Sequence, residues 1–369
     1  MRVAFLSFDF GEYCIRLASA LAREEEVLLL LPQRLATPHL SRLNQAMNFQ
    51  AFSKPRLRQP LQQIHMIFTL LQHIKNWDPD VIHLQQGHLW FNFALPLLGR
   101  YPLVLTIHDP RYHVGDWESQ KTPQMVMDFG FYRANQLIVH GKQLKQVVVD
   151  QLRIPGGIVH VIPHILLGDD TVHPQVQEDD QLILFFGRIW GYKGLEYLIR
   201  AEPLITAQVP GARIMIAGQG EDFTHYQRMM AHPEHFIVHN EYVSDDKRAE
   251  LFRRSSIVVL PYIDASQSGV IPVAYTFAKP VVATTVGGLP DMVEDGRTGY
   301  LVPPRDEKVL AEAVVRLLRD RDLRRQLGAN GKQKVETECS PEAVAQKTLG
   351  IYHQALNGAP LSAKKEDIR

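Results

Sequence analysis

Short apolar runs alternate with amphipathic stretches along most of the chain, and this alternation constrains the fold more than any other feature. Runs of three to five residues separated by helical stretches predict parallel strands that are buried on both faces. A first helix is expected over 14–22, after the first of these strands. The predicted strands of the first half are 3–6, 27–31, 81–83, 103–107, 136–139 and 158–162.

The alternation stops between 164 and 180 and then starts again. This segment is acidic, contains Pro174 and shows little periodicity, which predicts an interdomain linker over 166–180. We expect two α/β domains, 1–165 and 181–340, and a final helix near 341–356 through which 341–369 rejoins the first domain. The second half adds a helix over 195–207 and strands over 182–186, 213–217, 236–238, 257–260 and 281–283.

Charge and cysteine content exclude several classes of protein. The 40 Lys and Arg balance the 40 Asp and Glu, which argues against a dedicated nucleic-acid binder. Cys14 and Cys339 are too few for a disulfide scaffold or a cysteine-rich zinc site. No apolar run approaches the ~20 residues that span a bilayer, and the N-terminus does not have the pattern of a signal peptide. We therefore expect a cytoplasmic protein.

The segment LFFGRIWGYKGLEYLI, residues 184–199, places two cations just after a predicted strand. Gly187 makes the turn, and Arg188 and Lys193 follow before the next helix. The carboxyl end of a parallel strand faces the ligand crevice of an open α/β sheet. Arginine binds two phosphate oxygens at once and lysine adds a point charge, so the pair suits a diphosphate. The alternative is that both are solvated surface charges.

A second segment, residues 259–304, carries a polar loop over 264–268 after the strand that ends at Leu260. A helix is predicted over 269–277, with Ser268 as its N-cap. A helix N-terminus favours anions through its unpaired N–H groups and its dipole. The alternative is a buried helix with an ordinary cap. Further along, Gly287 and Gly288 would allow a ligand to approach the backbone closely.

The motif order resembles glycosyltransferase family 4. It runs from G-R-x4-K-G at 187–194 through IAGQG and VVLP to AKPVVATTVGGLPDMVEDGRTGYLVPP at 278–304. The resemblance covers most of the chain and is strongest over 181–320. It implies the α/β GT-B fold, in which two Rossmann-like domains with parallel sheets face a central cleft. It also implies a retaining hexosyltransferase that uses a nucleotide-sugar donor and needs neither metal nor cofactor.

The resemblance also implies roles for individual residues. Arg188 and Lys193 match the pair that grips the donor diphosphate. His108, after the strand 103–107, matches a histidine beside the transferred sugar, although simple packing would also explain it. His88 and Asp109 are expected near the acceptor or just behind it. With Asp264 added, the expected catalytic residues are His108, Arg188, Lys193 and Asp264, and the expected donor-binding residues are Gly11, Gly187, Gly218, Gly220, Tyr242, Val243, Gln267, Ser268 and Gly269.

The chain departs from the family pattern at two positions. The family usually has two glutamates eight residues apart, and the corresponding residues here are Ala265 and Val273. Asp264 is one residue away and is expected to replace the first carboxylate. Nothing acidic replaces the second. Gln267, Ser268 and the Gly269 backbone are the expected substitutes.

Residues 33–77 contain no Asp or Glu. Apolar residues at helical spacing (Leu61, Ile64, Ile67, Phe68 and Leu71) lie beside the cations, which is typical of a helix that rests on anionic lipid. A phosphorylated acceptor would be served by the same charge, and a core-facing helix with a solvated cationic face is the alternative. The cations are Arg34, Arg42, Lys54, Arg56, Arg58 and Lys75.

Together these features predict transfer of a sugar from a nucleotide-diphosphate donor to a hydroxyl of a glycan or a lipid-linked acceptor. The expected partners are that donor, that acceptor and an anionic membrane surface, without nucleic acid. Two alternatives remain open. One is a non-catalytic sugar-nucleotide-binding protein or partner subunit, and the other is a sugar-nucleotide epimerase.

Overall fold

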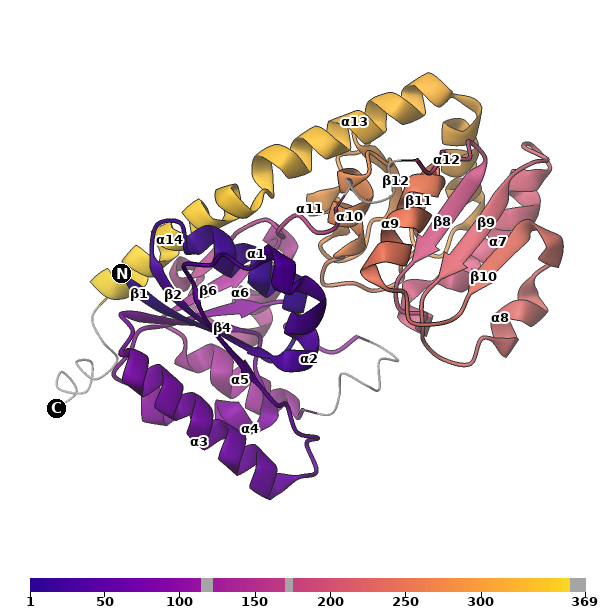
Figure 1. Ribbon diagram of the computed structural model, residues 1–369. Helices are drawn as coiled ribbons and strands as arrows, with labels where there is room; N and C mark the ends of the chain where they lie inside the picture. Colours follow the sequence, from indigo (N-terminus) through magenta and orange to yellow (C-terminus); the bar gives the residue numbers. More distant parts are fainter. Residues whose placement is uncertain (114–121, 170–174, 359–369) are drawn as a thin grey trace. The chain divides into compact units, whose positions relative to one another are not determined.

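The computed structural model describes residues 1–113, 122–169 and 175–358, which form two compact units. Unit 1 contains 1–112, 122–165 and 340–358, and unit 2 contains 113, 166–169 and 175–339. Part of the predicted linker, 170–174, and the end of the predicted C-terminal segment, 359–369, lie outside the described residues. Each unit is built around one parallel sheet (Figure 1).

The sheet of unit 1 has seven parallel strands in the order β3-β2-β1-β4-β5-β6-β7. Successive side chains of a strand point to opposite faces, and both faces of the central strands are buried. This explains the unbroken apolar runs in the sequence. The strands are β1 (Arg2–Ser7), β2 (Glu26–Pro32), β3 (Asn48–Phe52), β4 (Val81–Gln85), β5 (Leu103–Ile107), β6 (Gln136–Val139) and β7 (Val159–Val161).

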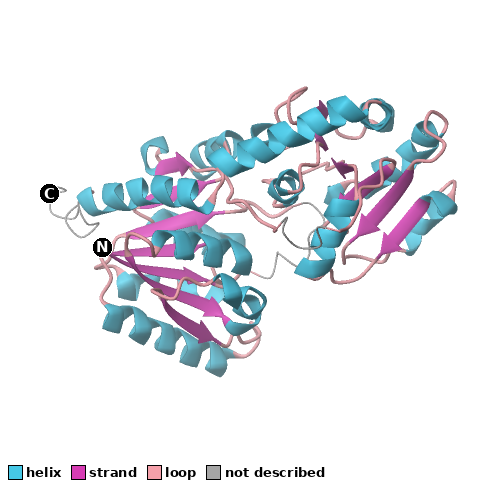
Figure 2. Cartoon of the chain, turned by 45° about the horizontal axis from the view of Figure 1, so that its top comes forward, coloured by secondary structure: helices cyan, strands magenta, loops and turns pink. Residues whose placement is uncertain are grey.

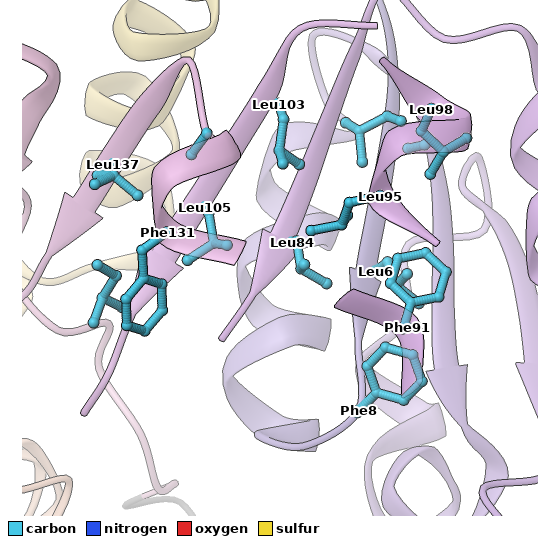
Figure 3. Close-up of a cluster of buried hydrophobic side chains, with 14 of the residues drawn as sticks. Leu6, Phe8, Leu84, Phe91, Leu95, Leu98, Leu103, Leu105, Phe131 and Leu137 are labelled. Atoms are coloured by element: carbon cyan, nitrogen blue, oxygen red, sulfur yellow. The ribbon is translucent and has the colours of Figure 1, made fainter. Parts of the chain in front are cut away.

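One face of this sheet packs against α3, α4, α5 and α6. Figure 3 shows Leu84, Leu105 and Leu137 of the strands beside Phe91 of α4 and Phe131 of α5. The helices of unit 1 are α1 (Gly11–Leu21), α2 (Gln33–Ala36), α3 (Pro60–Trp77), α4 (Leu89–Asn92), α5 (Gln124–Arg133), α6 (Lys142–Leu152) and α14 (Pro341–Asn357), with 3-10 turns η1 (Thr37–Arg42), η2 (Leu95–Leu98) and η4 (Gly156–Ile158).

The C-terminal helix α14 belongs to unit 1, where it packs beside α1. Tyr352 of α14 reaches the sheet, and its hydroxyl lies 2.6 Å from Nδ1 of His83 on β4. The other ring nitrogen of His83 lies 2.8 Å from the hydroxyl of Thr106 on β5. A buried polar contact therefore joins helix α14 to the centre of the first sheet.

The sheet of unit 2 has six parallel strands in the order β10-β9-β8-β11-β12-β13. Figure 2 shows helices flanking strands of this unit. They are β8 (Leu182–Phe186), β9 (Arg213–Ala217), β10 (Phe236–His239), β11 (Ile257–Leu260), β12 (Val281–Thr284) and β13 (Gly299–Val302). Ile183 and Phe185 pack with α7, α8 and α12 on one face, whereas Leu182 and Leu184 pack with α9, α10, α11 and α13 on the other. Both faces of the sheet are therefore covered.

The helices of unit 2 follow the same strand–helix alternation. They are α7 (Leu195–Thr206), α8 (Thr224–Met229), α9 (Asp245–Arg254), α10 (Val270–Thr276), α11 (Leu289–Met292), α12 (Glu307–Arg319) and α13 (Arg321–Glu338), with 3-10 turns η5 (Gly191–Lys193) and η6 (Pro233–His235). None of the helices in the described part of the chain combines the length and the apolarity needed to cross a lipid bilayer.

In each sheet the order of the strands reverses direction once. The point of reversal is where a ligand-binding site is expected. In unit 2 the chain leaves β8 toward β9 and later returns to the other side of β8 with β11. In unit 1 the corresponding neighbours are β1 and β4. Ligands of open α/β sheets bind beside the carboxyl ends of the strands at such a switch point. The loops that follow β8 and β11 are therefore the expected ligand-binding edge of unit 2.

The predicted α/β fold with two parallel sheets is confirmed, and five predicted strands agree with the structure residue for residue. Two strands were not predicted. The edge strand β3 is mostly exposed and therefore lacks an apolar run. The edge strand β13 contains Gly299, on which a Cβ would lie 1.9 Å from the carbonyl oxygen of Val281. The predicted helix 269–277 is shorter in the structure, and Gly269 rather than Ser268 is its N-cap residue.

Candidate functional site

The two predicted phosphate-binding cations lie in the loop after β8. Gly187 adopts a left-handed φ of 117°, which turns the chain away from the sheet. Arg188 is exposed, and its Nη2 donates a hydrogen bond to the hydroxyl of Tyr192 at 3.0 Å. This bond holds the guanidinium at the carboxyl edge of the sheet.

Lys193 is held by aromatic rings. Its Nζ lies 3.8 Å from the ring centroid of Tyr262 and 4.9 Å from that of Tyr192, so both rings attract the ammonium group. Burial raises the pKa of Tyr262, which keeps that phenol neutral. The next residue, Gly194, has a φ of 63°, and a Cβ there would lie 2.0 Å from the carbonyl oxygen of Pro261. Only glycine therefore lets the β8 and β11 loops approach this closely.

The loop after β11 brings Asp264 beside Tyr192, the residue that precedes Lys193. The carbonyl oxygen of Tyr192 accepts hydrogen bonds from the backbone N–H groups of Ile263 at 2.9 Å and Asp264 at 3.4 Å. The Asp264 carboxylate lies 3.0 Å from Nδ1 of His113, whose ring stacks on Tyr192 with centroids 4.6 Å apart. His113 and Tyr192 were not predicted, because their roles depend on a contact that joins distant parts of the sequence.

Ser268 has a local structural role at the start of α10. Its side chain is almost completely buried, and its Oγ accepts a hydrogen bond from the backbone N–H of Val270 at 3.3 Å. The hydroxyl of Tyr262 lies 3.3 Å from the same Oγ. Gln267 and Gly269 are half-buried on either side. The polar loop therefore packs directly against the ring that holds Lys193.

The glycines of the second unit are explained by backbone packing. Gly218 has a φ of 149°, and a Cβ on it would lie 1.8 Å from the carbonyl oxygen of Gly187. On Gly220 the Cβ would lie 1.9 Å from the carbonyl oxygen of Ile189. The backbone N–H of Ile189 donates to the carbonyl of Gln219 at 3.1 Å. The β9 turn thus supports the loop that carries Arg188.

Gly287 plays the same part for the β11 loop. It has a φ of 47°, and its Cβ would meet the carbonyl oxygen of Ala265 at 1.4 Å. The backbone N–H of Gly288 donates to the carbonyl of Ser266 at 3.0 Å. Ala265 and Val273, the two positions where the resemblance expects glutamate, are buried in the apolar core of unit 2.

The remaining predicted donor-binding residues follow β10. Tyr242 is 76% exposed and Val243 is half-buried. The next residue, Ser244, caps α9 by accepting a hydrogen bond from the N–H of Lys247 at 3.2 Å. An exposed aromatic ring at this edge of the sheet can stack on a nucleobase. Within the described part of unit 2, the loops around Arg188 bring no three metal-ligand atoms together.

In unit 1 the predicted residues lie after β1, β4 and β5. Gly11 begins α1, and a Cβ there would lie 2.3 Å from the carbonyl oxygen of Leu35. Phe10 has a left-handed φ of 60° and stacks on His108 with ring centroids 3.8 Å apart. The His108 side chain is fully buried, and its Nε2 lies 2.7 Å from Oε1 of Gln85.

His88 and Asp109 occupy different environments. His88 caps α4, where its Nδ1 accepts the N–H of Phe91 at 3.4 Å, and its ring stacks on Phe8 at 4.2 Å. Burial, with Lys54 nearby, lowers the pKa of His88 to about 3. Asp109 is half-buried, and its carbonyl oxygen accepts a hydrogen bond from Gln86 at 3.0 Å. In this structure, therefore, the ring of His88 stabilises its own loop.

Helix α3 lies within residues 33–77, the segment that contains no Asp or Glu. This helix carries an exposed stripe of apolar side chains, the α3 stripe. Leu61, Ile64 and Phe68 are 81%, 56% and 59% exposed, at spacings of three and four residues. The opposite side of α3 packs against the core through Met66, Leu70 and Ile74, among others. A groove of about 570 Å³ runs between α3 and the edge strand β3. Of the six cations, Arg42 pairs with Glu12 and Lys54 with Asp9.

Comparison with known protein families matches both units. A model described as Glycosyltransferase Family 4 matches residues 11–165, and one described as Glycosyl transferases group 1 matches residues 180–320. The chain is a glycosyltransferase of family 4 with the GT-B fold. The predicted family and enzyme class are therefore confirmed.

Individual relatives of this glycosyltransferase are distant. An uncharacterised glycosyltransferase of Methanocaldococcus jannaschii is 29% identical over 297 residues, covering 75% of this chain and 76% of that protein. The D-inositol 3-phosphate glycosyltransferase of a Nocardioides species is 29% identical over 314 residues. The match covers 75% of this chain and 67% of that protein. The alpha-D-kanosaminyltransferase of Streptomyces kanamyceticus is 29% identical over 179 residues, covering 48% and 46%.

Solved structures confirm the fold of the glycosyltransferase. Sucrose-phosphate synthase from Thermosynechococcus elongatus has a TM-score of 0.75 at 19% identity, covering 97% of this chain and 99% of that chain. HepE of Anabaena, in complex with UDP, has a TM-score of 0.73 at 16% identity, covering 96% and 100%. At these identities the likeness concerns the fold alone.

Buried histidines of unit 1, including His88 described above, should make its folding stability fall in acid. Burial lowers the pKa of His83 and His140 to about 3, that of His164 to about 4, and that of His108 well below its usual value. Because each imidazole binds a proton more readily in the unfolded chain, its contribution to stability is complete above pH ~6.5 and falls as the pH drops toward the folded-state pKa. When the pH falls from 7.5 to 5.5, each such histidine lowers the free energy of unfolding by about 1.4 kcal/mol.

We predict that His140→Asn makes stability less dependent on pH. The asparagine can still donate to the carbonyl oxygen of Ile162, as Nδ1 of His140 does at 3.0 Å, but it cannot be protonated. Urea unfolding gives the difference in unfolding free energy between pH 7.5 and pH 5.5. This difference should be about 1.4 kcal/mol smaller in His140→Asn than in the wild type. His65→Asn, at an exposed position, is the control. An unchanged difference in His140→Asn would contradict the prediction.

We also predict that Gly218→Ala destabilises unit 2 by at least ~2 kcal/mol, because strain at a disfavoured φ of about 1–3 kcal/mol is joined by a steric clash. Gly296→Ala is the matched control, because Gly296 has a φ of 71° with no atom within 4 Å of the added Cβ. Denaturant unfolding measures both variants. If Gly218→Ala were no worse than Gly296→Ala, the close approach of the Gly187 carbonyl would not be what requires glycine.

Proposed function

We propose that this glycosyltransferase transfers a sugar from a nucleoside-diphosphate donor held in unit 2 to a hydroxyl of a lipid-linked or glycan acceptor. The observation that carries the proposal is the pair Arg188 and Lys193 at the switch point of the second sheet. One cation is fixed by Tyr192 and the other lies over the ring of Tyr262. The solved structures of HepE include complexes with UDP and UDP-glucose, which supports a donor of this class.

The chemistry requires charge stabilisation at the leaving group. The bond between the anomeric carbon and the β-phosphate oxygen breaks, and its electron pair leaves with the diphosphate. The acceptor oxygen bonds to the anomeric carbon on the same face, and its proton passes to a leaving phosphate oxygen. Arg188 and Lys193 stabilise the growing negative charge more strongly than they stabilise the bound donor, which lowers the barrier.

In this proposal the two side chains also replace a metal ion. Two fixed positive charges beside a diphosphate supply the compensation that a divalent cation would otherwise give. Asp264 directly precedes Ala265 in the chain and is 43% exposed, and we assign it to the hydroxyls of the transferred sugar. Tyr242 is assigned to the base of the donor. Transfer with retention should therefore continue in the presence of a chelator.

The prediction that tests this function concerns Arg188→Ala and Lys193→Ala. Each should lower turnover at least ~100-fold, the scale of losing one donor that stabilises transition-state charge. A thermal-shift panel of sugar nucleotides first identifies the donor, since a ligand that binds the folded state stabilises it. Transfer is then followed by product analysis in the presence of EDTA.

Arg200→Ala is the matched control, because Arg200 is an exposed cation on α7 that lies over Tyr197 rather than in the β8 loop. Near-normal turnover in both site variants would overturn the leaving-group assignment. Tight nucleotide binding by the wild type without transfer or hydrolysis would identify a non-catalytic binding protein. Interconversion of donors without any acceptor would identify an epimerase.

We further propose that the α3 stripe rests on an anionic membrane that presents the lipid-linked acceptor. Arg56 and Arg58 are exposed just before α3, and residues 33–77 contain no acid to oppose them. Each cation near an anionic surface contributes ~1 kcal/mol. Leu61, Ile64 and Phe68 supply apolar area that can enter the headgroup region.

Vesicle co-sedimentation tests the membrane assignment. The enzyme should bind phosphatidylglycerol vesicles and not phosphatidylcholine vesicles. Replacing Leu61 and Phe68 by Asp should abolish binding, and Arg56→Ala should weaken it about five-fold. Leu204→Asp, a partly exposed apolar position in unit 2, is the control. Equal binding to both kinds of vesicle, or binding unaffected by the α3 changes, would exclude an anionic membrane as the partner.

A further inference from the structure

A carboxylate and two imidazoles meet in unit 2 at a place that sugar transfer does not use. Glu202 projects from α7 and is fully buried. Nδ1 of His232 lies 3.1 Å from its Oε2, and Nδ1 of His235 lies 2.6 Å from its Oε1. The hydroxyl of Thr206 donates to the same Oε1 at 3.0 Å. The two histidines are three residues apart, at the 3-10 turn η6 that precedes β10.

The geometry of this cluster suits a small divalent ion. The three ligand atoms lie within 4.8 Å of one another, and the two imidazole centroids are 5.4 Å apart. Around a tetrahedral ion with bonds of ~2.0–2.1 Å, neighbouring ligand atoms are about 3.3 Å apart. The His232 separations of 3.1 and 3.2 Å from the two carboxylate oxygens are close to this value. His235 would have to move outward by several tenths of an ångström.

The buried negative charge of Glu202 also favours a bound cation. Burying an ionised carboxylate is costly unless positive charge compensates it. Among the described residues, the ion-pair partners of Glu202 are His232 and His235, which carry positive charge only when protonated. A divalent cation would supply that charge while both imidazoles remain neutral ligands. The Thr206 hydroxyl would orient the carboxylate, as partners behind metal ligands commonly do.

The two histidine side chains are partly exposed to solvent. A metal ion could therefore reach the cluster, and a water molecule could serve as its fourth ligand. The side chain of His232 is 47% exposed and that of His235 27%, whereas Glu202 is fully buried. An ion at this place would be bound by protein on its inner side and by water on its outer side. Two histidines, one glutamate and a water form a known zinc ligand set.

We propose that Glu202, His232 and His235 form a binding site for Zn²⁺ or a similar divalent transition metal. The site lies at the amino end of β10, whereas Arg188 and Lys193 follow the carboxyl end of β8 in the same parallel sheet. It is therefore remote from the proposed chemistry. An ion bound here would fasten α7 to the segment that leads into β10. The proposal does not depend on the identity of the donor.

The test is a titration of the metal-stripped full-length protein with zinc chloride at pH 7.5, followed by calorimetry. We expect one equivalent to bind. His232→Ala and His235→Ala should each weaken binding at least ~100-fold, more than the loss of a partner behind a ligand usually costs. Substitution with Co²⁺ should give the intense visible bands of a tetrahedral ion, which an octahedral surface ion lacks.

His225→Ala is the matched control, because His225 is an exposed histidine of unit 2 on α8, outside the cluster, and this variant should bind zinc like the wild type. The His232→Ala variant changes a half-exposed side chain, so it tests the site even where Glu202→Gln fails to fold. No saturable binding of one equivalent by the wild type would overturn the proposal. Equal affinity in wild type, His232→Ala and His235→Ala would also overturn it.

Discussion

The close packing of the β8 loop against the β11 loop is the constraint on which the second unit's site depends. The Tyr192 carbonyl accepts the Ile263 N–H at 2.9 Å, and Gly194 lets the backbone of Pro261 approach. With the loops packed in this way, the Lys193 ammonium lies 4.9 Å from the ring centroid of Tyr192 and 3.8 Å from that of Tyr262. A flexible lysine thereby loses much of its freedom before any ligand arrives, so less ordering remains to be done on binding.

The glycines of the family motifs have a structural explanation here that precedes any ligand. A Cβ added to Gly218, Gly220 or Gly287 would overlap a carbonyl oxygen of a neighbouring loop. A side chain at any of them would push apart the turns that carry Arg188 and Asp264. Keeping the loop in position and, in the proposed function, admitting a diphosphate would therefore make the same demand on these residues. Motif matching alone does not separate the two requirements, whereas the backbone geometry does.

The sequence predicted most of the fold because buried parallel strands leave a direct signature. β8 and β11 are unbroken apolar runs, and their bounds followed from that pattern. The edge strand β3 lacked this signature because its side chains are mostly exposed. In the candidate site, Arg188 and Lys193 followed from their position after a strand. The stack of His113 on Tyr192 and the cluster around Glu202 did not, since both join residues that are at least 30 positions apart in the chain.

The low pKa of His108 limits the roles that this residue of unit 1 can have. Burial, together with the neighbouring histidines His140 and His164, lowers the pKa of His108 well below its usual value, so its imidazole is neutral at physiological pH. A neutral ring stacked beneath Phe10 cannot stabilise a departing diphosphate by charge. It can hold the β5 loop in place through its contact with Gln85. In the proposed reaction, positive charge for the leaving group would therefore come from Arg188 and Lys193 rather than from His108.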